Sequence, residues 1–127
     1  MTRILFVCLG NICRSPLAES VFRHLARERG VEVSGASRKL TAADLHRFDY
    51  VIAMDQQNLS DLRALAREHG GDARIHLLRE FDPEPGDLQV PDPYYGGPEG
   101  FDDVFAMVHR ACSALLDHLE QERAGDA

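Results

Sequence analysis

Cys8, Arg14 and Ser15 are the residues of this sequence whose types and spacing could do covalent chemistry. The loop from Cys8 to Arg14 can wrap so that successive backbone amides converge on a tetrahedral anion; Gly10 permits the close backbone approach and Asn11 can brace the loop. Arg14 can bind two oxygens of a phosphate group with its planar guanidinium group. The same positive surroundings lower the pKa of the Cys8 thiol and favour the nucleophilic thiolate, to which the Ser15 hydroxyl can donate a hydrogen bond.

A plain structural role is the alternative interpretation of these residues. A cysteine six residues before an arginine is a weak signal by itself. Cys8 could be a buried cysteine that ends a strand, with Arg14 on the surface and Ser15 capping a helix. The surrounding pattern favours the chemical interpretation, because an apolar strand runs directly into Cys8 and a helix begins near Ser15.

The elements that would position this loop are predicted from hydrophobic patterns. Apolar, β-favouring runs predict buried strands at 3–7, 50–54 and 74–78. Apolar residues at helical spacing predict helices from Ser15 as N-cap to Gly30, a short one at 42–48, and longer ones at 56–69 and 101–119. Strands that alternate with helices predict an α/β fold, a small parallel sheet with helices on both faces. We expect a single domain over 1–122 and a disordered tail at 123–127.

Composition excludes several other classes of protein. The chain has 127 residues and a formal net charge of −7, which argues against binding to nucleic acid or to an anionic membrane surface. No apolar run is long enough to span a membrane, so we expect a cytoplasmic protein. The three cysteines and six histidines show no metal-binding spacing, so we expect free thiols, no metal and no cofactor, with Cys112 as a buried core residue.

Two separated motifs resemble the same protein family. Residues 7–16 (VCLGNICRSP) resemble the signature loop of the low-molecular-weight protein tyrosine phosphatases, and residues 91–96 (PDPYYG) resemble their general-acid loop. Residues 48–55 (FDYVIAMD), followed by Asn58 and Leu59, resemble the central strand of the family. The resemblance covers nearly the whole chain in the family's order. It implies a phosphatase-I-like fold.

The resemblance also implies an activity, the hydrolysis of phosphotyrosine in protein substrates through a cysteinyl-phosphate intermediate. Cys8 attacks phosphorus, Arg14 holds the transferring group, and Asp92 protonates the departing phenolate and then activates water. Tyr94 and Tyr95 resemble the aromatic wall beside the substrate ring. The remaining residues of the implied phosphate-binding loop are Leu9, Gly10, Asn11, Ile12, Cys13 and Ser15. A reversible Cys8–Cys13 disulfide that protects the nucleophile from over-oxidation is implied in the same way.

The chain departs from the family in its length. It is shorter than the expected length by roughly thirty residues, and the gap follows the first helix. The gap implies loss of one edge strand and one helix, and residues 31–33 are either a remnant of that strand or part of a later segment. Uncovered apolar sheet surface would favour a homodimer or lower the stability.

The same residues are compatible with other functions. Arsenate reduction would need further cysteines to relay a disulfide, and only Cys112 lies downstream of Cys13. Phosphoarginine hydrolysis is disfavoured by Ile12 and by the pair Tyr94 and Tyr95. A phosphate-binding homologue without activity is the alternative outside enzymes. Simpler roles are a turn for Asp92 and packing for the two tyrosines and Cys13.

Overall fold

The computed structural model describes residues 2–7, 14–37, 41–84, 86, 90 and 97–125. For residues 14, 15, 97–101 and 123–125 it describes the backbone alone.

The described strands form one parallel four-stranded sheet. They are β1 (Thr2–Val7), β2 (Val33–Ser37), β3 (Tyr50–Ala53) and β4 (Arg74–Leu77), in the order β2-β1-β3-β4. Each neighbouring pair is parallel. The carboxyl ends of all four strands therefore lie at the same edge of the sheet, and β1, which precedes Cys8, is an interior strand. The predicted α/β class is confirmed.

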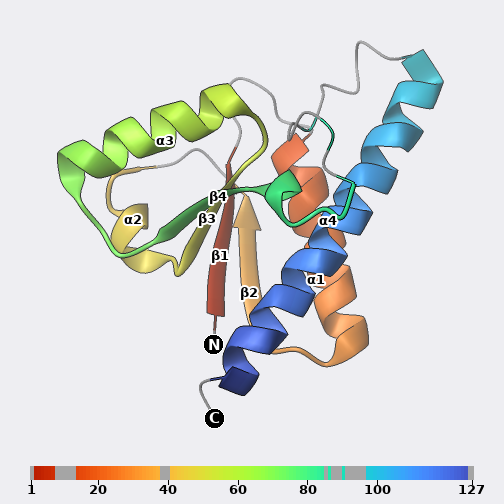
Figure 1. Cartoon of the computed structure of the whole chain (residues 1–127), viewed down its shortest axis with the longest axis horizontal. Helices are drawn as coiled ribbons and strands as arrows, with labels where there is room; N and C mark the ends of the chain where they lie inside the picture. Colours follow the sequence, from red (N-terminus) through yellow and green to blue (C-terminus); the bar gives the residue numbers. More distant parts are fainter. Residues whose placement is uncertain are drawn as a thin grey trace.

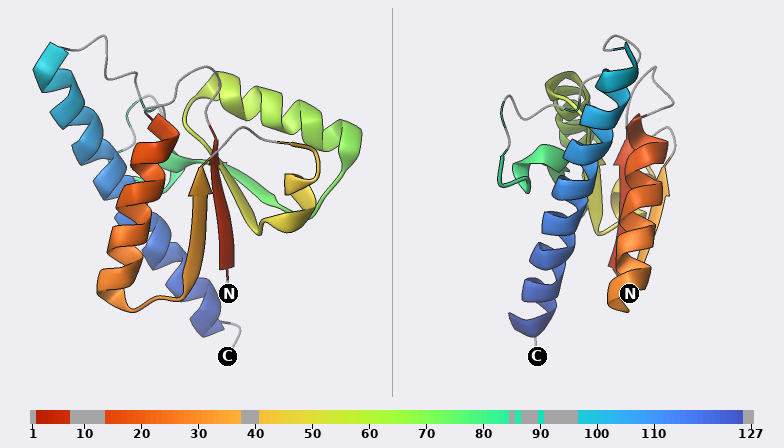
Figure 2. Two further views of the ribbon diagram at one scale, coloured as in Figure 1. Left: turned by 180° about the vertical axis from the view of Figure 1, so that it is seen from behind. Right: turned by 90° about the vertical axis from the view of Figure 1, so that its right-hand side faces the viewer.

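Helices cover both faces of this sheet, as predicted. The α-helices are α1 (Arg14–Arg29), α2 (Asp44–Arg47), α3 (Gln56–His69) and α4 (Gly97–Gly125), and a short 3-10 helix, η1, spans Leu78–Glu80. α1 and α4 lie side by side on one face, and α2 and α3 lie on the other (Figures 1 and 2). None of the helices in the described part of the chain is long and apolar enough to cross a membrane.

Successive side chains of β1 pack alternately into two separate hydrophobic cores. Ile4 and Phe6 are fully buried against α1 and α4, whereas Leu5 and Val7 are buried against α2 and α3. This period of two is the geometry of a strand with both faces covered. Burial of each such side chain contributes about 1.5–3 kcal/mol. The strand that leads into Cys8 is thus held on both faces.

β2 occupies the edge of the sheet next to β1, although we expected an edge strand to be lost. β2 pairs with β1 in parallel from Thr2↔Val33 to Phe6↔Ser37. Val33 is the first residue of β2. Of the two interpretations of residues 31–33, a remnant of a strand therefore agrees better with the structure than part of a later segment does. β2 approaches α1 closely, because a side chain added at Gly35 would meet the ring of Phe22 at 3.3 Å.

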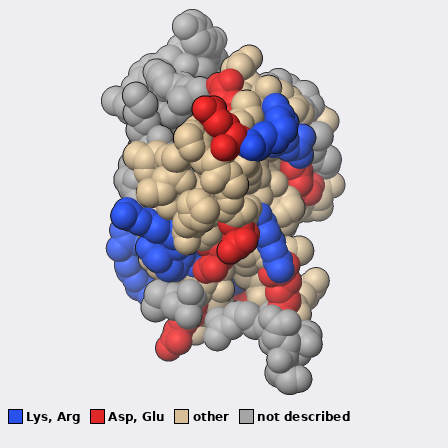
Figure 3. All heavy atoms as spheres, turned by 90° about the vertical axis from the view of Figure 1, so that its left-hand side faces the viewer, with Lys and Arg blue, Asp and Glu red and all other residues tan. Residues whose placement is uncertain are grey.

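The apolar surface expected on an uncovered sheet is not found among the described side chains. β2 presents small residues, including Ser34 and Ala36, of intermediate exposure. The large hydrophobic side chain that is exposed in the described part of the chain is Phe105, at 44%. Phe105 lies on α4, within the 101–119 stretch whose apolar residues at helical spacing predict one buried face. On the face that carries α2 and α3, acidic and basic side chains lie interspersed (Figure 3).

α4 is longer at both ends than its apolar stripe predicts. It begins at Gly97 and continues to Gly125, beyond the point where we placed the start of the tail. Near its carboxyl end, Glu122 accepts hydrogen bonds from the Tyr50 hydroxyl and from Arg74, the latter at 2.7 Å. Burial, together with the Glu122 hydrogen bond, raises the pKa of Tyr50 to about 12. This cluster ties α4 to the amino ends of β3 and β4.

Candidate active site

The loop with the predicted nucleophile joins an interior strand to the first helix. β1 ends at Val7, which is 2% exposed, and α1 begins at Arg14. Ser15 is already helical, so the helix begins before the N-cap that the sequence predicted. The predicted residues Cys8, Leu9, Gly10, Asn11, Ile12 and Cys13 lie outside the described residues, as do the side chains of Arg14 and Ser15. The structure therefore describes the two elements that hold this loop.

α1 is fixed firmly against the sheet. The rings of Phe22 and Phe6 meet edge to face, with centroids 5.4 Å apart, and Ala18 is fully buried beside them. The first residues of a helix carry free backbone N–H groups and the positive end of the helix dipole. Because α1 follows the loop directly, this positive end lies at the carboxyl edge of the sheet. An anion bound by the loop would be stabilised there.

A second helix begins at the same edge of the sheet. Asp55 follows β3 with extended backbone angles (φ −146°, ψ 173°) and caps α3, since its Oδ1 accepts a 2.8 Å hydrogen bond from the Asn58 backbone N–H. An Asp at this position satisfies a donor that the helix leaves free. The N-termini of α1 and α3 therefore both lie at the carboxyl edge.

Asn58 is a polar group in this region to which the sequence assigned no chemical role. It is 3% exposed, and its Oδ1 accepts no hydrogen bond from any described residue. A buried oxygen without a donor costs about 1–3 kcal/mol. The sequence pattern does not indicate that Asn58 is buried, because a polar residue in the first turn of a helix normally faces solvent.

Val90, two residues before the predicted general acid, is bound beside the end of β3. The backbone N–H of Val90 donates a 2.8 Å hydrogen bond to the Met54 carbonyl, and Val90 is fully buried. Val7 and Ala53 are register partners on neighbouring strands, which lie about 4.8 Å apart. Cys8 and Met54 each follow one of these partners, so both motifs start from adjacent points of the sheet edge. Asp92, Tyr94 and Tyr95 lie outside the described residues.

A buried carboxylate fixes the chain before this entry point. Asp82, 3% exposed, accepts hydrogen bonds from Arg110 Nε at 2.6 Å, from Arg79 Nε at 3.3 Å and from the Glu84 backbone N–H at 2.8 Å. Burial alone would raise the pKa of Asp82, but the hydrogen bonds from Arg110, Glu84 and Arg79 outweigh it and hold the pKa below its ordinary value. Asp82 therefore stays ionised and joins the 82–84 segment to α4.

Cys112 has the surroundings of a structural cysteine, as predicted. It is fully buried on α4, and its Sγ lies 3.7 Å from the Ala18 carbonyl oxygen. Burial raises the pKa of its thiol, which suppresses the reactive thiolate.

Comparison with known proteins gives one consistent family. The sequence matches the family model described as low molecular weight phosphotyrosine protein phosphatase over residues 3–36 and 26–125. A Streptomyces coelicolor protein named low molecular weight protein-tyrosine-phosphatase is 36% identical over 160 aligned positions, covering 98% of each chain. The crystal structure of YfkJ from Bacillus subtilis has a TM-score of 0.82 and 32% identity, covering 96% of each chain. The crystal structure of DARP, a drosophila arginine phosphatase, has a TM-score of 0.82 and 28% identity, covering 94% of this chain and 98% of DARP.

The comparisons also support the shortening inferred from the sequence. The alignment with the Streptomyces protein has 160 positions, more than the 127 residues of this chain. Part of that relative therefore has no counterpart here. The chain matches the family model in two segments that overlap between residues 26 and 36. The match is therefore interrupted near the end of the first helix.

Proposed function

Because this chain belongs to the low molecular weight phosphotyrosine protein phosphatase family, we propose that it hydrolyses phosphotyrosine in proteins with Cys8 as nucleophile. The family match over residues 3–36 and 26–125 carries the proposal. The framework supports it, because β1 ends at Val7 and α1 begins at Arg14, which is the strand–loop–helix arrangement that suits an anion-binding loop.

In the proposed reaction the Cys8 thiolate attacks phosphorus, and the bond from phosphorus to the phenolic oxygen breaks. Asp92 gives its proton to that oxygen, so tyrosine leaves as a neutral phenol. Arg14, the loop amides and the α1 N-terminus stabilise the charge on the transferring phosphoryl group. Asp92, now a carboxylate, takes a proton from water as the water attacks the cysteinyl-phosphate. Inorganic phosphate leaves, and the Cys8 thiolate is restored.

The hydrogen bond from Val90 to Met54 supports the role given to Asp92. It holds the chain two residues before Asp92 at the end of β3, next to the strand that leads into Cys8. A general acid must come within hydrogen-bond reach of the leaving oxygen. The hydrogen bond of Val90 fixes the chain just before Asp92 at the carboxyl edge of the sheet, the edge at which β1 also ends.

Phosphoarginine hydrolysis is the second candidate, because DARP, an arginine phosphatase, is among the similar structures. Both reactions would use Cys8 and Arg14, so the choice falls to the residues around the leaving group. Ile12, Tyr94 and Tyr95 offer apolar and aromatic surface, which suits an aryl ring better than a guanidinium group.

Reversible oxidation of the site belongs to the same proposal. Hydrogen peroxide would oxidise the Cys8 thiolate to a sulfenic acid, and the Cys13 thiol would then form a disulfide with loss of water. We expect activity lost to peroxide to return with dithiothreitol in the wild type. In Cys13→Ser we expect recovery to fall steeply, because the sulfenic acid proceeds to irreversible products. Equal recovery in both proteins would remove Cys13 from this role.

The deciding experiment is para-nitrophenyl phosphate hydrolysis across pH by the reduced protein. Cys8→Ser should abolish activity, and Asp92→Ala should lower kcat by about 10²–10⁴-fold and remove the basic limb of the pH profile. Phosphotyrosine and phosphoarginine, supplied as free amino acids, separate the two candidate substrates.

Two variants serve as matched controls. Cys112→Ser changes a buried cysteine, and Asp102→Ala removes an exposed carboxylate from α4; both should keep near wild-type rates. A folded, reduced wild type without activity toward any of the three substrates would overturn the enzyme proposal. It would leave a phosphate-binding homologue as the explanation.

A further inference from the structure

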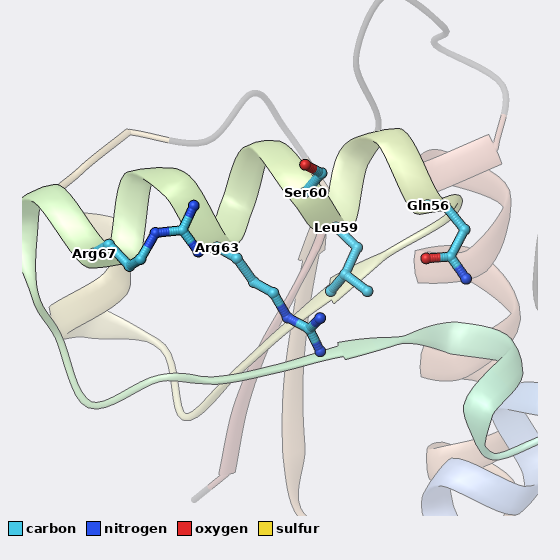
Figure 4. Close-up of a pocket in the computed structure, with 5 residues that line it drawn as sticks. All are labelled: Gln56, Leu59, Ser60, Arg63 and Arg67. Carbon is cyan, nitrogen blue, oxygen red and sulfur yellow. The ribbon is translucent and has the colours of Figure 1, made fainter.

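α3 carries a polar face that the proposed reaction does not use. Gln56, Ser60, Arg63 and Arg67 follow one another at spacings of four, three and four residues, which places them along one side of the helix. We call these four residues the basic face. With Leu59 they line a shallow groove of about 260 Å³ (Figure 4). The acidic residues of this helix, Asp61 and Glu68, fall on a different side.

The two arginines of the basic face are free cations within the described part of the chain. Both side chains are exposed, and neither guanidinium group makes a hydrogen bond or ion pair with another described residue. Five other arginines contact carboxylates: Arg23 pairs with Glu19, Arg29 with Asp117, Arg74 with Glu122, and Arg79 and Arg110 with Asp82, whereas Arg27 and Arg47, on other helices, do not pair with described residues. In a chain with 21 acidic residues, two neighbouring guanidinium groups thus stay available to an external anion.

One end of the basic face lies beside the candidate active site. Gln56 is the first residue of α3 and follows Asp55 and Met54. The Met54 carbonyl binds the backbone of Val90, two residues before Asp92. From this point the basic face extends along α3 for about 16 Å, at the helical rise of 1.5 Å per residue. A substrate segment that leaves the site in this direction would pass over Arg63 and then Arg67.

The spacing of the two arginines fits an extended peptide. Residues four apart on a helix are separated by about 6 Å along its axis. Side chains two apart on an extended chain lie on the same side, at about 6.6 Å. We propose that the basic face binds acidic side chains at alternate positions in an extended segment of the protein substrate, about three to five residues from the phosphotyrosine. This inference rests on the proposed function and adds a sequence preference to it.

An acidic peptide suits the basic face better than a nucleic acid or an anionic membrane does. The net charge of −7 opposes any large polyanion, whereas two arginines match two carboxylates. Arginine also binds carboxylates through two parallel hydrogen bonds.

The test compares two phosphotyrosine peptides that differ in those two positions, Glu in one and Gln in the other. At low salt the wild type should have a kcat/KM about three- to ten-fold higher for the Glu peptide, mainly through KM, as expected for two exposed ion pairs. Arg63→Ala/Arg67→Ala should bring the ratio close to one and leave para-nitrophenyl phosphate hydrolysis unchanged. Arg63→Glu/Arg67→Glu should instead prefer a peptide with Lys at both positions.

A double variant with the same change in charge is the matched control. Arg27 and Arg47 lie on other helices; their side chains are exposed, and their guanidinium groups make no hydrogen bond or ion pair with the described residues. Arg27→Ala/Arg47→Ala should keep the preference for the Glu peptide. Equal kcat/KM for the two peptides, or equal loss of the preference in both double variants, would overturn the inference. If para-nitrophenyl phosphate is not hydrolysed, the proposed function fails, and the peptides' affinity for the Cys8→Ser protein, measured by fluorescence anisotropy, tests the basic face alone.

Discussion

Cysteine reactivity in this chain depends on position in the fold. Cys112 is fully buried and its thiol pKa is raised, so we predict that it does not react with iodoacetamide in the native protein at neutral pH. Mass spectrometry after brief labelling should find Cys112 unmodified, and labelling in guanidinium chloride should modify it completely. The Cys112→Ser variant gives the matched peptide map. Rapid native labelling of Cys112 would mean that α1 and α4 separate readily around it.

At the same scale, residue types and spacing could predict candidate chemistry but not every buried partner. Cys8, Arg14 and Asp92 stand in patterns whose chemistry can be stated without coordinates. Asn58 could not be found in this way, because its burial depends on how α3 packs, and a helical pattern places an asparagine in the first turn at the surface. Asp82 is a similar case. Its partner Arg110 lies 28 residues away, and no local pattern joins them.

Among the elements, α3 has a cap whose energetic contribution can be measured. The Asp55 carboxylate accepts the hydrogen bond from the Asn58 backbone N–H, so Asp55→Ala should lower the free energy of unfolding by about 1 kcal/mol. Asp55→Asn keeps an oxygen acceptor and should lower the free energy of unfolding by only a few tenths of a kcal/mol. Urea denaturation of the three proteins measures both changes. Equal losses in the two variants would assign the effect to the charge instead of the hydrogen bond.

The connection between α4 and the segment after η1 should make stability depend on acid. The folded pKa of Asp82 is below its ordinary value, so its contribution is complete above about pH 4, the unfolded pKa, and is lost as the pH falls through the folded pKa. At neutral pH, Asp82→Asn should lower the free energy of unfolding by about 3 kcal/mol, because Arg79, 5% exposed, and Arg110 both lose the carboxylate charge that they contact.

Urea denaturation between pH 7 and pH 2 tests this dependence. The difference between wild type and Asp82→Asn should shrink as the pH falls below about 4. Asp103→Asn, at an exposed position of α4, is the control and should change stability by less than about 0.5 kcal/mol at any pH. A constant difference at all pH values would contradict the ionised pair.

Whether an element could be predicted depended on how strong its own pattern was. α3 spans the predicted 56–69, because Asp55 caps it and its apolar residues keep helical spacing. β2 could not be assigned, since Ser34, Gly35 and Ala36 have neither alternation nor strong β-propensity; pairing with β1 makes it a strand. Phe105 matched the apolar spacing of α4 and is nonetheless exposed. Spacing tells which residues share a face but not how far the packing partner extends.

At the scale of the whole molecule, a shorter chain still encloses two cores. The sheet keeps a strand on each side of β1, with α1 and α4 on one face and α2 and α3 on the other (Figure 2). The small side chains of β2 need less cover than large apolar ones would. This is the physical reason why the loss of a segment after α1 leaves no large apolar patch among the described residues.

The described residues offer little apolar surface for the dimer that the shortened sequence led us to expect, so we predict a monomer of 14.2 kDa at micromolar concentrations. The net charge of −7 adds repulsion between copies, which salt weakens, so sedimentation equilibrium should be run at low and high salt. Phe105→Ser removes the large exposed hydrophobic side chain of the described surface and should sediment as the wild type does. A wild-type dimer that Phe105→Ser abolishes would place an interface on α4. A dimer that survives this substitution would return the interface to the sheet edge at β2, where backbone groups of an outer strand can pair with a second copy.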